Sequence, residues 1–117
     1  MLAAHTVALD LIRALRSVVA TLRTYSSGAA DQVERAASSI VHNIAEGGAP
    51  QWSRPRRFFD MAHGSAGEIR GALDVADAWG WQLDCEQAHV LLDRELGLLY
   101  GLTRRSRTTQ SGGSRKR

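Results

Sequence analysis

Cysteine and long apolar runs are the two features that this sequence most clearly lacks. Cys85 is the only cysteine among 117 residues, so no disulfide can form within the chain, and such a chain is typical of a reducing compartment. The first apolar segment is interrupted by Asp10, Arg13 and Arg16, which excludes both a signal-peptide core and a membrane span. We therefore expect a cytoplasmic protein that does not enter the membrane.

Signals of β-structure are also missing. No segment alternates apolar and polar residues, and no Asn-Gly pair marks a hairpin. Instead, four segments repeat apolar residues at spacings of three and four, which is the period of an amphipathic helix. The four stripes are Ala4, Ala8, Leu11, Leu15, Val18 and Leu22; Val33, Ala37, Ile40 and Ile44; Phe58, Ala62, Ala66, Ile69, Leu73 and Ala76; and Ala88, Leu92, Leu96 and Leu99.

Turn and capping residues separate the first two predicted helices. The first helix is expected to end by Gly28. Asp31 and Glu34 have the spacing of a capping box, which predicts that the second helix starts there. Gly47 and Gly48 predict its end, with glycine in the left-handed conformation that closes many helices.

The third and fourth predicted helices have similar signals. Ser53 is a suitable N-cap and Pro55 fits the first turn of a helix. The sequence Trp79-Gly80-Trp81 predicts the end of the third helix, with the two indole rings covering the open end of the core. Asp84 is then the predicted N-cap of the fourth helix.

Residues 1–103 are therefore predicted to form one all-α domain, an antiparallel up-down-up-down four-helix bundle. Residues 104–117 contain six basic and no acidic residues among Ser, Thr, Gly and Gln, which predicts a disordered basic tail. The tail accounts for more than the whole net charge of +3, since residues 1–103 alone carry −3. The predicted bundle is thus mildly acidic.

Arginines form one cluster within the predicted bundle. Arg54, Arg56 and Arg57 open the third helix at its positive dipole end, where cations are disfavoured and a bound phosphate would relieve the repulsion. Trp52 beside them could stack on a base, although a solvated charged turn is the more common outcome. The candidate nucleic-acid-binding residues are Arg54, Arg56, Arg57, Arg104, Arg105, Arg107, Arg115, Lys116 and Arg117.

Two carboxylate–histidine pairs have the spacing that di-iron bundles use. Asp60 and His63 lie on the third predicted helix, and Glu86 and His89 on the fourth. Folding the two helices back on each other places His89 about 18 Å along the axis from His63. One metal pair cannot bridge that distance, so we predict no metal site.

Other polar side chains also give no catalytic pattern. His42 and Glu46 could share a helix face, and Cys85 lies at the start of the fourth predicted helix. None of them is accompanied by a paired nucleophile and base or by a phosphate-binding glycine loop. We predict no catalytic residue and no cofactor, and expect that the protein is not an enzyme.

Small residues are concentrated in the third predicted helix. Gly64, Ser65, Ala66, Gly67 and Gly71 lie within two turns, although each helical glycine costs about 0.5 to 1 kcal/mol relative to alanine. Close approach of another helix would offset this cost. That helix could belong to the same bundle or to a neighbouring subunit.

The segment Ser38–Gly47, followed by Arg57-Phe58 and then Ala62–Glu68, resembles a known family. It is similar to the bacterial four-helix-bundle proteins found in intervening sequences of large-subunit ribosomal RNA genes, which are related in fold to accessory proteins of diversity-generating retroelements. The resemblance implies a ring-like homopentamer that binds RNA or DNA, without enzymatic activity. It also implies that its motif residues fix helix packing or subunit contacts; these are Asn43, Glu46, Gly47, Gly64, Ser65 and Glu68.

Two functions remain open from the sequence. The first is a non-enzymatic oligomer that binds nucleic acid electrostatically through the Arg54–Arg57 turn and the tail, as an adaptor for a larger nucleoprotein machine. The alternative is a scaffold for protein–protein contacts in which the tail only favours solubility. Binding of RNA or DNA at low salt separates the two.

Overall fold

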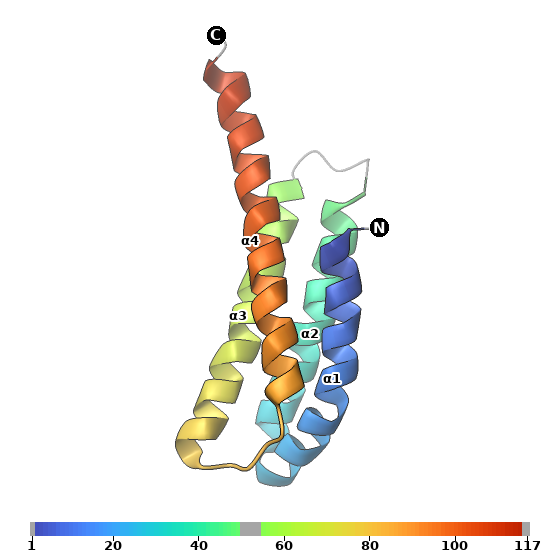
Figure 1. The fold of residues 1–117 in the computed structure, drawn as a ribbon, viewed down its shortest axis with the longest axis vertical. Helices are drawn as coiled ribbons and strands as arrows, with labels where there is room; N and C mark the ends of the chain where they lie inside the picture. The colour runs from blue at the N-terminus through green and yellow to red at the C-terminus, as the bar shows by residue number, and fades with distance from the viewer. Residues whose placement is uncertain (1, 50–54, 116–117) are drawn as a thin grey trace.

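The structure, a computed structural model, consists of four helices packed side by side (Figure 1). It describes residues 2–49 and 55–115, with side chains described up to Arg104. The helices are α1 (Ala3–Tyr25), α2 (Ser27–Gly47), α3 (Pro55–Trp79) and α4 (Glu86–Arg115). Contacts join α1 to α2, α2 to α3, α3 to α4 and α4 back to α1. The predicted all-α four-helix fold is confirmed, and this cyclic order is consistent with the predicted up-down topology.

The core follows the predicted stripes with two differences. All the stripe residues of α1 and α2 are buried. On α3, Phe59 is buried at 5% exposure whereas the predicted Phe58 is only half-buried. On α4, Leu96 is half-buried, and the adjacent Glu95 is fully buried at 0% exposure. The remaining stripe residues of α3 and α4 are buried as predicted.

The junction between α1 and α2 is shorter than the sequence predicts. Ser26 alone separates the two helices, and its hydroxyl oxygen accepts a hydrogen bond from the Ala29 N–H at 3.1 Å. The capping box predicted at Asp31 and Glu34 is therefore wrong. Both carboxylates instead bind Arg23 of α1. Ser26 provides the N-cap because its backbone is extended while its oxygen reaches the first turn.

The end of α2 also differs from the expectation. Gly48 caps the helix with φ −87° and ψ −6°, which is right-handed, so the predicted left-handed glycine is wrong here. Gly47 is required for another reason: a Cβ built on it would lie 2.7 Å from Cε1 of the buried Phe59. The predicted N-cap of α3, Ser53, lies outside the described residues.

A left-handed glycine does occur at the other end of the molecule. Gly80 has φ +78° and directly follows α3. Trp81 then stacks on Tyr25 with ring centroids 5.4 Å apart, and it packs against the core as predicted. Trp79 does not cover the core, since it is 72% exposed. The helix α4 starts after Cys85, whose carbonyl accepts from the His89 N–H, so the predicted cap at Asp84 is one residue early.

The last helix extends beyond the ends of the other three (Figure 1). Thr103 is the last buried residue among those whose side chains are described, close to the predicted end of the bundle. Where the sequence predicts a disordered tail, α4 runs on as a helix to Arg115. No proline or glycine interrupts residues 102–111, so nothing in that segment forces the helix to end. Within the described part of the chain, no helix combines the length and apolar character that crossing a membrane requires.

Candidate functional site

The described arginines of the candidate interface lie at one end of the bundle. An ion pair between Arg70 and Asp93 shows the register in which α3 and α4 pack. Arg57 lies thirteen residues before Arg70, and Arg104 lies eleven residues after Asp93. Since the two helices are antiparallel, these spacings of about 20 and 16 Å bring Arg57 and Arg104 to nearly the same level.

The cations at this end are not equally free to bind a ligand. Arg57 and Arg104 are exposed, whereas the Nε of Arg56 lies 3.6 Å from Oδ2 of Asp60. Arg54 and the side chains of residues 105–117 lie outside the described part of the structure. The described portion of the predicted interface thus contains two exposed arginines, Arg57 and Arg104, and a third, Arg56, that is paired with Asp60.

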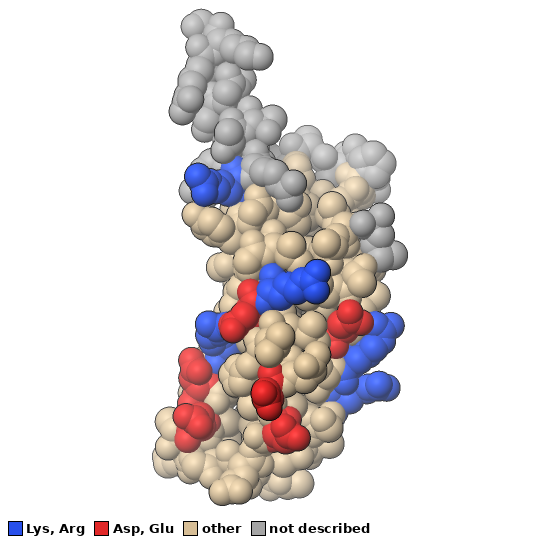
Figure 2. All heavy atoms as spheres, viewed as in Figure 1, with Lys and Arg blue, Asp and Glu red and all other residues tan. Residues whose placement is uncertain are grey.

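Carboxylates gather at the opposite end, around the turn between α3 and α4. Asp74, Asp77, Asp84 and Glu86 are all exposed there. In Figure 2, several acidic side chains are scattered over the lower half of the viewed face. The bundle therefore has a charge gradient along its long axis, with its acidic end remote from Arg57 and Arg104.

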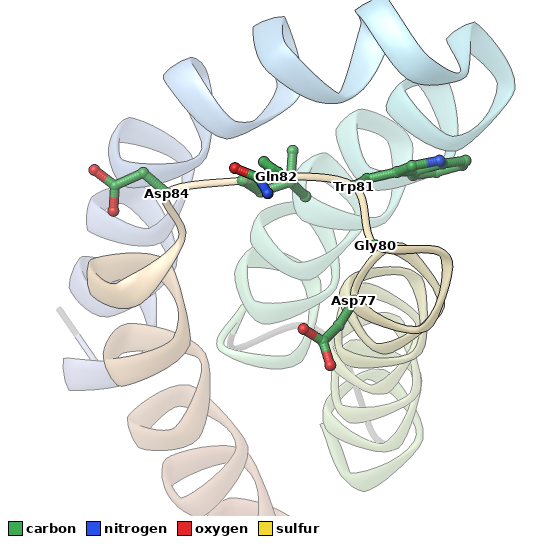
Figure 3. A pocket seen from close by; sticks show the side chains of 6 residues that line it. Asp77, Gly80, Trp81, Gln82 and Asp84 are labelled. Atoms are coloured by element: carbon green, nitrogen blue, oxygen red, sulfur yellow. The ribbon is translucent and has the colours of Figure 1, made fainter.

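Residues of the turn at the acidic end line a pocket that is open to solvent (Figure 3). Asp77 and Asp84 lie on its two sides, and Trp81 points away from Asp84. Burial raises the pKa of the adjacent Cys85 thiol, and the charges of Asp84 and Asp77 raise it further. A thiol with a raised pKa has little thiolate at neutral pH, which makes Cys85 a poor nucleophile.

The two carboxylate–histidine pairs are far apart in the structure. The ion pair of Arg70 with Asp93 places His89 opposite residue 74, which is eleven residues along α3 from His63. Among the described residues, no three His, Cys, Asp or Glu side chains form a group that could hold a metal ion.

Three of the motif residues take part in packing between α2 and α3. Asn43 donates from Nδ2 to the carbonyl and the hydroxyl of Ser39, at 2.9 and 3.0 Å. The Ser65 hydroxyl donates to the Ser39 hydroxyl at 3.0 Å. Gly47 lets the ring of Phe59 approach the end of α2. The motif therefore joins two helices through one polar cluster and one close contact.

The other three motif residues, Glu46, Gly64 and Glu68, are exposed. A Cβ on Gly64, Gly67 or Gly71 would meet no described atom within 4 Å. The alternative in which these glycines allow close packing within the bundle is therefore wrong. They lie on the outer face of α3, along which Met61, Val75 and Trp79 are 48%, 53% and 72% exposed.

Glu95 is a feature that the sequence analysis missed. Its side chain is fully buried in the apolar stripe of α4, between Leu92 and Leu99. Neither carboxylate oxygen has a hydrogen-bond partner among the described residues. This desolvation raises the pKa of Glu95 to about 8. A search for apolar periodicity assigns a glutamate to the surface, so no signal in that pattern could have found it.

The fold and the geometry of the motif define a class: a small all-α protein in which α2 and α3 are joined by the Asn43–Ser39–Ser65 cluster. Comparison with known families makes this specific. The chain belongs to the 23S rRNA-intervening sequence protein family, whose sequence model matches residues 3–94. The match includes α1, α2, α3 and the start of α4, and it ends immediately before Glu95. A search of curated proteins finds no match.

Proposed function

We propose that this protein is a non-enzymatic homo-oligomer, with a pentamer as the expected assembly, that binds nucleic acid electrostatically at its basic end. The observation that carries the proposal is the convergence of Arg57 and Arg104 at the end from which the basic segment 104–117 continues. RNA is the first ligand to test, because the family is named for 23S rRNA.

Charge polarity supports contact at one end only. Phosphates are attracted by Arg57 and by the six basic residues of segment 104–117, which include Arg104. The exposed carboxylates of Asp74, Asp77 and Asp84 repel them at the other end. In a ring whose axis follows the bundles, every basic end lies on the same face, and the nucleic acid binds that face.

The outer face of α3 supports the assembly. The side of α3 opposite the core presents exposed apolar side chains and glycines together with Glu68; the apolar residues and glycines are Met61, Gly64, Gly71, Val75 and Trp79. Exposed apolar side chains alternating with glycines suit the close approach of a second helix. A second copy of the chain is the proposed occupant, as an oligomer of five in which this face meets a different face of the next subunit.

A salt titration of RNA binding tests the role of segment 104–117. Each phosphate contact contributes about −0.9 to the slope of log affinity against log salt for a duplex, so six contacts give about −5. Deletion of residues 104–117 should remove most of this slope together with most of the affinity. Retention of both would remove this segment from the mechanism.

A pair of double variants with equal charge loss tests whether Arg56 and Arg57, in the first turn of α3, contact the nucleic acid. Replacement of both by glutamine should weaken binding and reduce the slope by about 1 to 2, since Arg56 is also paired with Asp60. Replacement of Arg16 and Arg35, which lie on α1 and α2 away from the basic end, removes the same charge and should change the slope less. Equal effects of the two double variants would contradict a localised interface.

The scaffold alternative has support from the same outer face of α3. A protein that forms oligomers yet binds neither RNA nor DNA at low salt would favour it. The proposal assigns no catalytic, metal or cofactor site to the bundle and places the protein in the cytoplasm. Stoichiometric iron, manganese or zinc after purification would contradict the part that concerns metals.

A further inference from the structure

Helix α4 buries two polar side chains that lack hydrogen-bond partners among the described residues. Glu95 is fully buried and Thr103 is 8% exposed, both on the inward face of α4. The two carboxylate oxygens of Glu95 and the hydroxyl of Thr103 have no hydrogen-bond partner in the described part of the chain. Burial of two unpaired polar side chains on one helix makes the free energy of packing that helix onto the bundle less favourable.

The buried polar residues in the middle of α2 and α3 differ from Glu95, although Arg56 Nε near the start of α3 also lacks a hydrogen-bond partner among the described residues. The buried polar residues of those helices, Asn43 and Ser65, are both hydrogen-bonded to Ser39. In addition, the family match ends at residue 94, before Glu95 and Thr103. The unpaired polar groups of α4 thus lie in the part of the helix that follows the matched region.

We propose that Glu95 makes the docking of α4 dependent on a proton: α4 packs against α1 and α3 when the Glu95 carboxyl is neutral, and it is released when the carboxyl ionises. An ionised carboxylate without a partner is strongly disfavoured in an apolar interior. A neutral carboxyl is tolerated, and Leu92 and Leu99 on either side keep the helix in contact with the core. The proposal concerns α4 itself and stands whether or not the protein binds nucleic acid.

Charged groups on the surrounding helices do not compensate Glu95. On α3, Arg70 is paired with Asp93. On α1, Arg13 is paired with Asp10 at 3.0 Å. Desolvation is the cause of the raised pKa of Glu95. The register of Arg70 and Asp93 places Glu95 opposite Glu68 of α3, an exposed carboxylate that cannot neutralise it. The other charged or titratable side chains near this level are Arg16 on α1, Arg35 on α2, His63 on α3 and Arg94 on α4.

The direction in which pH changes the stability of docked α4 follows from the pKa of Glu95 in the docked and undocked states. An unfolded or undocked Glu95 has an ordinary pKa near 4.5, whereas the docked one has a pKa of about 8. Between these values the docked state holds one more proton, so its stability decreases as the pH rises. The equilibrium constant for docking should fall about tenfold per pH unit across this window and level off above it.

Comparison of the full-length protein with Glu95→Gln tests this directly. Denaturant unfolding is measured at several pH values between 5.5 and 8.5, at one protein concentration. Glu86→Gln is the matched control, because Glu86 is an exposed glutamate on the same helix. The parent and Glu86→Gln should lose stability as the pH rises, and Glu95→Gln should lack that loss. Parallel pH profiles for all three proteins would overturn the proposal.

Hydrogen exchange then shows whether α4 is the element that responds. Protection factors in α4 should fall with rising pH before those in α2, and Glu95→Gln should abolish the difference. A uniform fall across all helices would contradict selective release of α4. If Glu95→Gln folds poorly because its amide is also unpaired, Glu95→Met serves as the neutral variant. A carbon-13 titration of Glu95 that shows an ordinary midpoint near 4.5 would also overturn the proposal.

Discussion

At the scale of single residues, Gly47 connects the sequence motif to the packing of the bundle. The ring of Phe59 occupies the space that a side chain at residue 47 would need. Phe59 is itself buried at 5% exposure, so its ring cannot move away freely. The glycine of the Glu46-Gly47 pair is thus explained by a contact between α2 and α3 rather than by the backbone conformation at the helix end.

The variant Gly47→Ala should therefore destabilise the protein by about 1 to 3 kcal/mol, the typical cost of overpacking a core. Gly97→Ala is the control, because a Cβ there meets no described atom within 4 Å. That change should stabilise α4 by about 0.5 to 1 kcal/mol through helix propensity. Denaturant unfolding of both variants measures the effects. A Gly47→Ala protein as stable as the parent would show that Phe59 can adapt.

A second prediction concerns the hydrogen bond between Ser65 and Ser39. A double-mutant cycle with Ser39→Ala and Ser65→Ala should give a coupling energy of about 1 kcal/mol, since the 3.0 Å bond joins two partly buried hydroxyls. Each free energy of unfolding is obtained from chemical denaturation. Additive single effects, with no coupling, would mean that the two hydroxyls do not interact in solution.

Glu95 and Phe59 show why residue-level burial could not be read fully from the sequence. The apolar period selected Leu96 and Phe58, each adjacent to the residue that is actually buried. A small rotation about the helix axis can bury the adjacent residue instead, while the other apolar residues of the stripe stay in the core. The orientation is then set by all the partner helices together, which a pattern along one segment does not contain.

At the scale of helices, the α1–α2 junction shows that capping depends on competition between nearby candidates. Asp31 and Glu34 have the spacing of a capping box, yet Ser26 starts α2 and both acids bind Arg23. The sequence predicted the existence of all four helices and the approximate extent of the first three, because their apolar period is long and regular. It did not predict this helix start, because several local signals lay within one turn of each other.

Substitutions at the two candidate caps test this assignment. Ser26→Ala should cost about 1 kcal/mol, the usual loss for a side-chain N-cap. Asp31→Ala removes only an exposed ion pair and should cost less, about 0.5 kcal/mol. Thermal unfolding ranks the two variants. A larger loss for Asp31→Ala would contradict a helix start at Ser26.

The outer face of α3 leads to a prediction about assembly. Gly64→Leu places a large side chain where no atom of the described bundle lies within 4 Å. The helical content should be retained while the oligomer dissociates, because the added side chain obstructs the proposed contact between subunits. Ala20→Leu, on the exposed face of α1, is the control. Unchanged mass of the Gly64→Leu protein by sedimentation would exclude this face from the interface.

At the scale of the whole molecule, charge is distributed along the axis of the bundle. Arg57 and Arg104 lie at one end and Asp74, Asp77 and Asp84 at the other. The sequence showed that basic residues concentrate in two segments, but it could not show that α3 and α4 bring these segments together. That depends on the antiparallel register, which the pair between Arg70 and Asp93 defines.

The motif was only partly interpretable from sequence for the same reason. Its resemblance to a family was visible over about residues 38–73, and the family match confirms it over residues 3–94. The division of its residues between packing and surface was not visible. Gly47 and Gly64 are both motif glycines, yet only Gly47 has a neighbour within the described bundle.

The central claim, an oligomer that binds nucleic acid, is tested most directly by the mass of the protein in solution with and without RNA. Sedimentation equilibrium reports both assembly and bound ligand in one experiment. The account predicts a mass of about five chains that increases when RNA is added at low salt, and returns to the protein-only value at high salt. A single chain of 12.8 kDa whose mass RNA does not change would contradict it.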